Sequence, residues 1–462
     1  MSRSRRLAAG LCVVLGLGVA CSSRSPATST SPSPSPSPSA AASPSPGLGF
    51  DWPEYHQGPG RTGAGPGTPE LGTPREAWRT TFDGDVYASP LIAAGHVLVA
   101  TENNTVYSVD LFSGSVVWTR HLGDPVAAST LPCGNIGPVT GITGTPAVDV
   151  AADSLYVVAF LRGYRHVLYT LSLADGSVLA QQPVDPPGSV PSVQQQRGAL
   201  AIGSGRVYVT LGGLYGDCGN YHGYVVAVPV AGGSMLVYRT PVAREAGIWS
   251  PAGATLSAAG DLYVVTGNGS ATRTFAYSNS VIELTPDLQV RSFFAPSNWQ
   301  ALDAGDTDLG SVGATLMPGL GVVVAIGKQG VVYLLGADKL GGVGGQIASG
   351  AVCAGAWGGT AWQGSMMWVP CSDGLVALSV TQTSISVAWR AAPRTASPIV
   401  GAGAVWAIDS DAGLLYALDI TSGAVLFKGS VGAAHHFSTP AATDGFVVAP
   451  AGNRVVAFST AA

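Results

Sequence analysis

The sequence predicts an all-β protein, a single eight-bladed β-propeller of four-stranded antiparallel blades that follows a disordered N-terminal tether. A short apolar core of the form V-Y-x-V or L-Y-A-L, often followed by Asp and a Thr/Ser-x-Gly turn, recurs along the chain. Its eight copies centre on Tyr107, Tyr169, Val226, Ile282, Tyr333, Val376, Tyr416 and Val456. Their spacing falls from about 60 residues to about 40, the range of propeller blades. The 63 Gly and 32 Pro residues fall between short Val/Leu/Tyr-rich runs, which is typical of many short strands joined by tight turns.

Residues 1–20 have the pattern of a targeting segment. Three arginines precede an apolar run over 7–20 that is too short to span a bilayer comfortably. The run ends in Leu-Gly-Val-Ala before Cys21, which resembles a bacterial lipobox. The resemblance implies cleavage before Cys21 and a diacylglycerol on its sulfur. The alternative is an ordinary secretory peptide in which this cysteine is incidental. We expect a protein that is exported and lipid-anchored to the outer face of the bacterial cell membrane.

Residues 21–49 form the predicted linker. The segment consists mostly of Ser, Pro, Thr and Ala and includes the run SPSPSPSPS. Such a composition cannot bury enough apolar surface to fold, and its prolines keep the chain extended. We expect it to hold the folded body away from the membrane.

Residues 50–462 carry the predicted propeller. A small residue and Pro, followed by a further strand, stand ahead of most copies, as at Ser89-Pro90, Thr145-Pro146, Ser250-Pro251, Ser397-Pro398 and Thr439-Pro440. The last copy has no outer strand after it. Residues 76–82 look like the outer strands that contain Trp118 and Trp389. We therefore expect 76–82 to complete the last blade and close the ring, which leaves only short outer edges. Seven blades is the alternative, if one middle copy is an insertion.

The cysteines agree with export. Cys12 lies in the targeting segment and Cys21 would carry the lipid, so four cysteines remain. An even number outside the cytoplasm predicts two disulfides, with three pairings open. We favour Cys133–Cys218, because both lie in Cys-Gly-Asn loops of neighbouring early blades. We also favour Cys353–Cys371, because the two flank a hairpin-sized segment within one blade. A metal site is a weak alternative, since no C-x-x-C or nearby His pair exists.

The charge distribution argues against one class of partner. The formal net charge is −5, and lysine occurs only at Lys328, Lys339 and Lys428. Without a basic stripe, nucleic acid is not expected to bind.

The repeat resembles the blades of the pyrroloquinoline quinone (PQQ) propeller superfamily, and the resemblance spans residues 78–459. The clearest copies are VYSVDLFSG at 106–114 and LYALDITSG at 415–423. The superfamily contains quinoprotein alcohol dehydrogenases and also cofactor-free scaffolds, such as an outer-membrane assembly lipoprotein. The stretch Trp52-Pro53-Glu54-Tyr55-His56 is also similar to the opening of many such exported proteins.

One region is similar to the enzymes of this superfamily, in which a T-G-N motif supplies an Asn to calcium and a later Asp-rich segment supplies the catalytic carboxylate. Here Thr266-Gly267-Asn268 matches the first, and the second has Asp303, Asp306 and Asp308 as counterparts. The resemblance implies that Asn268 binds the cofactor and that Asp303 or Asp306 takes the alcohol proton. The alternatives are a turn residue at Asn268 and, for the three aspartates, a solvated loop or a structural Ca²⁺ site.

The departures from the enzymes decide the functional prediction. No adjacent cysteine pair and no C-x-x-C-H haem motif occur, and the calcium-binding glutamate has no counterpart. We therefore expect no cofactor other than Ca²⁺ at the aspartate loop. The predicted function is a binding or scaffolding module for an envelope protein or a glycan. The alternative is a PQQ- and Ca²⁺-dependent dehydrogenase of alcohols or sugars.

Three further groups of residues are weaker candidates. Trp249, Trp357 and Trp362 either stack between blades or line the central funnel as an aromatic platform. His435 and His436 are expected near the channel mouth as loop structure. Tyr221 and His222 are expected to pack around the Cys218 disulfide.

Overall fold

The computed structural model describes residues 50–66, 71–270 and 273–460. The predictions for residues 1–20 and for the linker, including lipidation at Cys21, lie outside these described residues. No helix of the described residues combines the length and the apolar character that a bilayer span requires.

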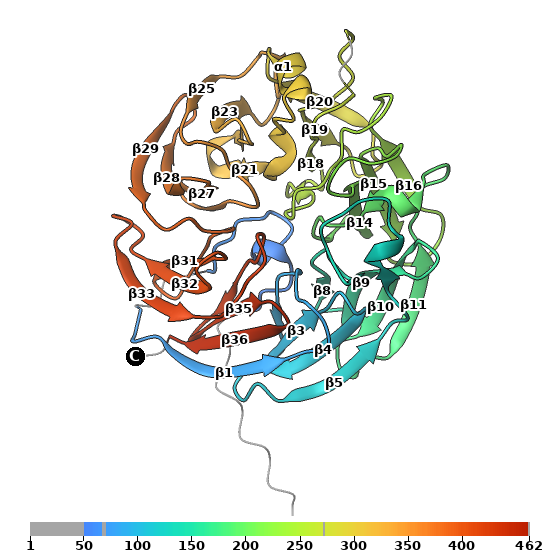
Figure 1. Ribbon diagram of the computed structural model, residues 1–462. Coiled ribbons are helices and arrows are strands. Elements are labelled where there is room, and N and C mark those ends of the chain that lie inside the picture. Colours follow the sequence, from blue (N-terminus) through green and yellow to red (C-terminus); the bar gives the residue numbers. More distant parts are fainter. Residues whose placement is uncertain (1–49, 67–70, 271–272, 461–462) are drawn as a thin grey trace, which may run out of the picture. The chain divides into compact units, whose positions relative to one another are not determined.

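Eight antiparallel sheets form a ring, as predicted, and the seven-blade alternative is set aside (Figure 1). Blade 1 contains β2 (Leu91–Ala93), β3 (His96–Ala100), β4 (Thr105–Asp110) and β5 (Val116–His121), and blade 2 contains β8 (Ala147–Asp149), β9 (Ser154–Leu161), β10 (Arg165–Ser172) and β11 (Val178–Pro183). Blade 3 contains β13 (Ala201–Gly203), β14 (Arg206–Gly213), β15 (Tyr224–Pro229) and β16 (Leu236–Arg239), with β12 (Gln194–Gln195) beside β14. Blade 4 contains β17 (Thr255–Leu256), β18 (Leu262–Val265), β19 (Val281–Leu284) and β20 (Val290–Ala295), with β24 (Gly342–Val343) added parallel to β20.

The remaining four blades follow the same order from the inside outwards. Blade 5 contains β21 (Thr315–Met317), β22 (Val322–Ala325), β23 (Val331–Gly336) and β25 (Ala348–Ala351), and blade 6 contains β26 (Ala361–Gln363), β27 (Met366–Cys371), β28 (Gly374–Val380) and β29 (Ile385–Ala391). Blade 7 contains β30 (Ile399–Gly401), β31 (Ala404–Asp409), β32 (Leu414–Leu418) and β33 (Val425–Ser430). Blade 8 contains β34 (Ala441–Thr443), β35 (Phe446–Ala451), β36 (Arg454–Ser459) and β1 (Arg75–Thr81). Outside the blades lie the β6–β7 pair (Val126–Ala127, Val139–Thr140), the helix α1 (Trp299–Ala304) and five 3₁₀ turns at Tyr55–Gln57, Ala128–Thr130, Pro191–Val193, Leu309–Ser311 and Pro318–Leu320.

The repeat detected in the sequence is the third strand of each blade. All eight repeat centres fall within β4, β10, β15, β19, β23, β28, β32 and β36. The predicted ring closure is also present, because β1 pairs antiparallel with β36, with Trp78 opposite Ala457 and Thr80 opposite Val455. Two segments from opposite ends of the described chain therefore share one blade.

The hydrophobic core lies between blades rather than inside one. One cluster joins Leu91 and Val106 of blade 1 to Val157 and Tyr169 of blade 2, and similar clusters join the other neighbouring blades. A blade buried on both faces needs strands without a polar face, and accordingly every residue of β9 is buried. Each blade is stable only against its neighbours, as in other repeat folds.

A tryptophan on the outer strand of one blade packs on the Thr/Ser-x-Gly turn of the next. The Trp389 indole N–H of blade 6 donates to the Ile420 carbonyl at 3.0 Å, over the turn of blade 7 that ends at Gly423. A Cβ at Gly423 would lie 2.5 Å from that indole, and the backbone there has φ +72°. Trp78 and Trp118 pack in the same way on the turns at Gly114 and Gly176. The Trp and Gly of the repeat are thus two halves of one contact between blades.

Residues 50–65, which we call the plug, fill the centre of the ring (Figure 1). The backbone of the plug makes hydrogen bonds to the inner strands of several blades. Examples are Trp52 with Ile92 of β2, Pro59 with Leu256 of β17, and Gly63 with Val400 of β30. Further bonds reach blades 2, 3, 6 and 8. Sequence analysis noted the similarity of this stretch to exported proteins but did not place it in the channel.

The centre of the plug is a buried ion pair. Arg61 Nη1 lies 3.0 Å from Glu54 Oε2, with side-chain exposures of 3% and 5%. The same guanidinium donates to the carbonyls of Leu200 at 2.7 Å and Ala254 at 3.2 Å. Buried charges persist when they are paired and fully hydrogen-bonded, and these bonds reach blades 3 and 4.

The Ser/Thr-Pro pairs begin the inner strands and connect neighbouring blades. The Thr145 hydroxyl accepts from the Ser89 N–H at 2.9 Å, and the Ser89 hydroxyl donates to the Thr439 carbonyl at 3.1 Å. The Tyr55 hydroxyl of the plug donates to the Ser397 hydroxyl at 3.0 Å. The small polar residue ahead of each proline is therefore part of a hydroxyl belt around the channel.

Both predicted disulfides are present. Cys133, in the connection from blade 1 to blade 2, is bonded to Cys218 in the β14–β15 loop of blade 3. Cys353 follows the outer strand of blade 5, whereas Cys371 ends β27 of blade 6. The second pairing is thus as predicted, but it joins two blades rather than two ends of one hairpin.

Candidate functional site

The channel has two different ends. Because the strands of a blade alternate in direction, the connections between blades and the loops between second and third strands all lie at one end, which we call the mouth. The loops between first and second strands and between third and fourth strands lie at the other, the plug end. The mouth therefore receives loops from all eight blades.

Aromatic and cationic side chains meet across the mouth. The Arg197 guanidinium lies 5.1 Å from the Phe437 ring centroid, and Trp249 packs edge-on against Phe437 at 6.4 Å. The Lys328 ammonium lies 5.8 Å from the Trp249 ring. These four residues, the mouth cluster, come from four different loops. The sequence prediction that Trp249 either stacks between blades or lines the funnel is resolved in favour of the funnel.

Little space remains between the plug and the mouth cluster. A cavity of about 10 Å³, lined by Tyr55, Tyr87, Arg197 and Phe437 among others, lies between them. That volume accommodates about one water molecule. The Tyr55 ring is thus the floor of the mouth.

Titratable groups of blades 8 and 1 line the mouth beside this cluster. His435 stacks on Tyr87 with centroids 3.8 Å apart, and its Nε2 lies 3.6 Å from an Asp85 oxygen. Burial lowers the pKa of His435, although Asp85 opposes this. Burial also raises the pKa of Tyr87 to about 12, with Glu102 and Asp85 adding to the shift. His435 and His436 thus lie at the mouth, as expected.

Glu102 is only partly paired. The Gly141 N–H donates to its Oε2 at 2.6 Å, while its Oε1 is buried with no hydrogen-bond partner among the residues that the structure describes. Burial raises the pKa of Glu102 to about 7, and Asp85 adds to this, whereas Gly141, Thr143 and Arg197 oppose it. Sequence reasoning did not single out this residue.

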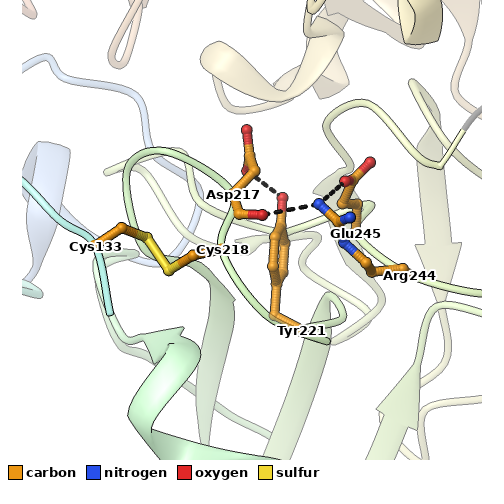
Figure 2. The surroundings of a disulfide bond; sticks show 6 residues. All are labelled: Cys133, Asp217, Cys218, Tyr221, Arg244 and Glu245. Atoms are coloured by element: carbon orange, nitrogen blue, oxygen red, sulfur yellow. Dashed lines mark hydrogen bonds and ion pairs between the residues drawn. A yellow bond between two sulfur atoms is a disulfide. The ribbon is translucent and has the colours of Figure 1, made fainter. Parts of the chain in front are cut away.

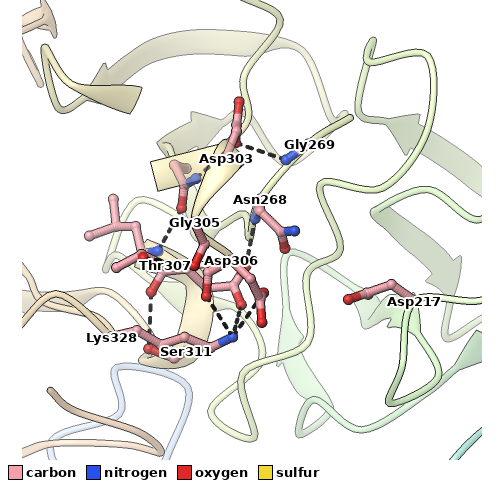
Figure 3. Close-up of polar contacts among 12 residues, drawn as sticks. Asp217, Asn268, Gly269, Asp303, Gly305, Asp306, Thr307, Ser311 and Lys328 are labelled. Atoms are coloured by element: carbon pink, nitrogen blue, oxygen red, sulfur yellow. Dashed lines mark hydrogen bonds and ion pairs between the residues drawn. The ribbon is translucent and has the colours of Figure 1, made fainter. Parts of the chain in front are cut away.

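Asn268 and the aspartate loop do come together, as the sequence predicted (Figure 3). The Asn268 N–H donates to Asp308 Oδ1 at 2.5 Å, and the Gly269 N–H donates to Asp303 Oδ1 at 2.9 Å. A Cβ at Gly267 would lie 2.4 Å from Asp308 Oδ1, so glycine permits this approach. The T-G-N segment is held to the loop between blades 4 and 5 by its backbone.

The Asp303 carboxylate accepts three hydrogen bonds from the surrounding chain. Besides Gly269, it accepts from the Ser278 hydroxyl at 2.7 Å and the Asn279 amide at 2.9 Å. The Asn279 carbonyl in turn accepts from the Leu309 N–H at 2.7 Å. Burial raises the pKa of Asp303, and these donors oppose the shift. Asp303 acts as a structural staple between the β18–β19 loop and α1.

A lysine pairs with the other two aspartates. Lys328 Nζ lies 2.6 Å from Asp308 Oδ2 and 3.1 Å from Asp306 Oδ1, and it also donates to the Asp306 carbonyl at 3.2 Å. Although burial disfavours its charge, the two carboxylates raise the pKa of Lys328 above its usual range. The ammonium therefore holds the positive charge beside these carboxylates.

The residues present do not fit a quinone held on calcium. Among the residues that the structure describes, one group of three His, Cys, Asp or Glu side chains has its ligand atoms within 4.8 Å of one another, namely Cys353, Cys371 and Asp373. The two sulfurs of that group are bonded to each other. Asp303, Asp306 and Asp308 do not form such a group, and in addition Asp303 accepts three hydrogen bonds while Asp306 and Asp308 pair with Lys328. Calcium needs six or more oxygen ligands converging on one point.

A second polar cluster lies beside the Cys133–Cys218 disulfide (Figure 2). The Tyr221 hydroxyl donates to the Asp217 carboxylate, the Arg244 guanidinium donates to the Asp217 carbonyl at 2.8 Å, and Arg244 also pairs with Glu245. Glu245 forms a bridge to Gly269, next to Asn268. The predicted packing of Tyr221 near the disulfide is present. Asp217, Arg244 and Glu245 were not predicted, because no motif of the sequence marks them.

The comparisons with known proteins agree on the fold and differ in activity. A family model described as outer membrane protein assembly factor BamB matches residues 71–282, from the closing strand to β19. No curated protein matches the sequence. A quinohemoprotein alcohol dehydrogenase, ADHIIG from Pseudomonas putida HK5, superposes with a TM-score of 0.72 at 13% identity, over 89% of this chain and 80% of that one.

Two further solved structures are a second dehydrogenase and BamB itself. A europium-containing methanol dehydrogenase gives a TM-score of 0.67 at 13% identity, over 88% of this chain and 98% of that one. BamB from Moraxella catarrhalis gives 0.59 at 12% identity, over 84% of this chain and 100% of that one. At these identities the likeness shows the fold alone. The chain therefore has the β-propeller fold of these solved structures, and residues 71–282 are similar to the BamB family.

Proposed function

We propose that this protein is a binding module of the bacterial cell envelope, which holds a protein or a carbohydrate at the mouth of the propeller. One observation carries the proposal: residues of the plug occupy the channel, and above them Arg197, Trp249 and Phe437 from different loops meet across the mouth. There the loops present aromatic and charged side chains instead of a deep cavity.

The loops of the mouth are rigidly supported, which favours binding. The Cys133–Cys218 disulfide fixes the β14–β15 loop, whose Tyr215 is 68% exposed. An exposed aromatic side chain on a fixed loop loses little entropy on binding, and tyrosine is enriched among residues that dominate protein interfaces. The Cys353–Cys371 disulfide supports the mouth on the blade 5–6 side in the same way.

The envelope location rests on the sequence. The lipobox-like end at Cys21 and the Ser/Pro-rich segment after it support export and anchoring. We expect Cys21→Ala to release the protein to the medium or to leave an unprocessed precursor. Normal membrane retention of that variant contradicts the anchor.

A photo-crosslinking pair tests the binding face. A photoreactive aromatic amino acid replaces Tyr215 at the mouth or, as the matched control, Phe112 at the plug end, which is 43% exposed. Irradiation of living cells is expected to yield a discrete adduct from position 215 and none from position 112. Adducts only from position 112, or none from either, overturn the proposal that the mouth is the binding face.

The second candidate is a quinone-dependent dehydrogenase. The observation in its favour is that Asn268, Asp303 and Asp308 lie together at the mouth. Against it stand the Lys328 ion pairs and the three hydrogen bonds that Asp303 accepts, together with carboxylate oxygens that do not converge on one point.

A further inference from the structure

A pocket of about 170 Å³ lies at the mouth between blades 6 and 7. Its lining comes from the connection between blades 5 and 6, the β27–β28 and β31–β32 loops, and the connections on both sides of blade 7. The volume is close to that of a cavity of about 150 Å³ that holds one benzene molecule. The pocket is therefore large enough for a single six-membered ring.

One wall of the pocket is covalently fixed. Trp357 and Cys371 line it, and Cys371 is bonded to Cys353, four residues before Trp357. The Ser372 N–H donates to the Gly355 carbonyl at 2.8 Å, and Ala356 forms a bridge with Cys371. The backbone that carries Trp357 is thus fixed before any ligand arrives, which lowers the entropy cost of binding.

The rest of the lining provides both hydrogen-bond donors and hydrogen-bond acceptors. Arg394 Nη1 lies 4.0 Å from Asp411 Oδ2, with side-chain exposures of 64% and 80%, so both groups keep hydrogen-bonding capacity for a ligand. Burial, and next the charge of Arg197, lower the pKa of His436, which therefore offers one donor and one acceptor as a neutral imidazole. The Thr395 Oγ1 is buried and has no hydrogen-bond partner among the described residues. A buried hydroxyl of this kind needs a partner.

This chemistry selects one class of ligand. An anion such as phosphate would be attracted by Arg394 but repelled by Asp411 beside it. A flat apolar ring would leave the Thr395 hydroxyl and the polar wall unpaired at a cost. A sugar ring has an apolar face of C–H groups and a rim of hydroxyls that each donate and accept. We propose that the pocket binds one sugar ring of a glycan, which packs on the Trp357 indole while its hydroxyls bind Arg394 and Asp411.

This inference rests on the proposed binding function and specifies its ligand. The test uses saturation-transfer difference NMR on the purified propeller with glucose, N-acetylglucosamine, mannose and glucuronic acid as probes. We expect at least one probe to bind with a dissociation constant on the order of 1 mM, as for a ligand of few heavy atoms. Trp357→Ala, Arg394→Ala and Asp411→Asn are each expected to weaken that binding at least fivefold.

A second exposed Arg–Asp pair at the mouth supplies the matched control. Arg162 and Asp124 of blades 2 and 1 lie 2.9 Å apart with exposures of 79% and 63%, away from the pocket. Arg162→Ala and Asp124→Asn should leave sugar binding unchanged, and thermal melting of all variants confirms that they fold.

Three outcomes overturn the sugar assignment: no saturation transfer to any probe, equal losses in the control variants, or inorganic phosphate that binds to the unmodified protein more tightly than every sugar probe. The crosslink at position 215 separates the two proposals. If it persists while no sugar binds, the binding module stands and its ligand at this pocket is not a sugar.

Discussion

The plug end of the channel and its mouth contain the same kinds of side chain but pair them differently. At the plug end, Glu54 and Arg61 are buried together and every strong donor of the guanidinium reaches a carbonyl or the carboxylate. At the mouth, Arg394 and Asp411 are mostly exposed, Thr395 lacks a described partner, and Glu102 has one unpaired oxygen. Buried, paired polar groups stabilise a fold, whereas the exposed Arg394 and Asp411 keep hydrogen-bonding capacity for a partner.

The difference indicates that the plug contributes to the stability of the fold, whereas the mouth provides the groups that bind a partner. The plug connects the inner strands of the ring, so changes there should weaken folding. The mouth is carried by loops, so changes to its exposed groups should leave folding intact and alter binding. The predictions that follow compare the two ends, from the largest expected effect to the smallest.

Arg61→Met at the plug should produce the largest loss of stability. The variant leaves the Glu54 carboxyl group buried without its partner, and breaking such a pair costs about 3–5 kcal/mol. Because burial raises the pKa of Glu54 to about 7 even beside Arg61, the loss should grow as the pH rises above 7. Urea unfolding at pH 7 measures the loss. Arg394→Met at the mouth should change the free energy of unfolding by less than about 0.5 kcal/mol, because its side chain is 64% exposed.

A double variant shows whether the pair itself matters. Glu54→Gln with Arg61→Met removes both charges and should recover part of the loss, since the penalty comes from the orphaned carboxylate. Equal destabilisation by Arg61→Met and Arg394→Met contradicts the contrast between the two ends.

Glu102→Gln should change how the free energy of unfolding depends on pH, because Glu102 is a buried titratable group of the mouth. Burial raises the pKa of Glu102 from 4.5 to about 7, so the folded state keeps a proton that the unfolded state loses in this window. The contribution of Glu102 to the free energy of unfolding is fully present below pH 4.5 and is lost as the pH rises towards 7. The loss is on the order of 3 kcal/mol. The variant should lack this part of the slope. Identical pH profiles of the two proteins between pH 4.5 and 7 show that Glu102 ionises normally.

Gly423→Ala tests how much the contact between Trp389 and the turn of the next blade contributes to stability. A methyl group at Gly423 meets the Trp389 indole at 2.5 Å, whereas Gly205 has nearly the same φ, +70° against +72°, and nothing within 4 Å. Gly205→Ala should cost about 1 kcal/mol for backbone strain alone. Gly423→Ala should cost roughly 1–3 kcal/mol more through overpacking. Equal costs in thermal or urea unfolding mean that the turn does not depend on the tryptophan contact.

The features that could be predicted are those that repeat or pair locally. The third-strand motif gave the eight blades, because every blade needs the same apolar strand between two neighbours. The lone strand at 76–82 was predicted to close the ring because it lacks a blade of its own, and β1 occupies that position. The cysteine pairings followed from export and from matching loops, although Cys353 lies in the connection from blade 5 rather than in blade 6.

The plug and, apart from Trp249, the mouth cluster could not be predicted, since their contacts join residues far apart in sequence. The 50–65 stretch has no periodicity, and Arg61 reaches Leu200 and Ala254 only in the closed ring. Asn268 and the aspartates were found by motif, but the motif did not show that Lys328, from another blade, pairs with Asp306 and Asp308. A motif gives the residue types of a site, whereas its neighbours decide which charges are already paired.

The most direct test of a binding module against a dehydrogenase is dye reduction by the purified protein supplied with PQQ and Ca²⁺. We expect no alcohol- or sugar-dependent reduction above the rate without protein, and no tight quinone binding by calorimetry, because Lys328 pairs with Asp306 and Asp308 and Asp303 accepts three hydrogen bonds from the chain. Robust reduction that is lost in Asn268→Ala and in Asp303→Ala or Asp306→Ala contradicts the binding module and makes the protein a dehydrogenase.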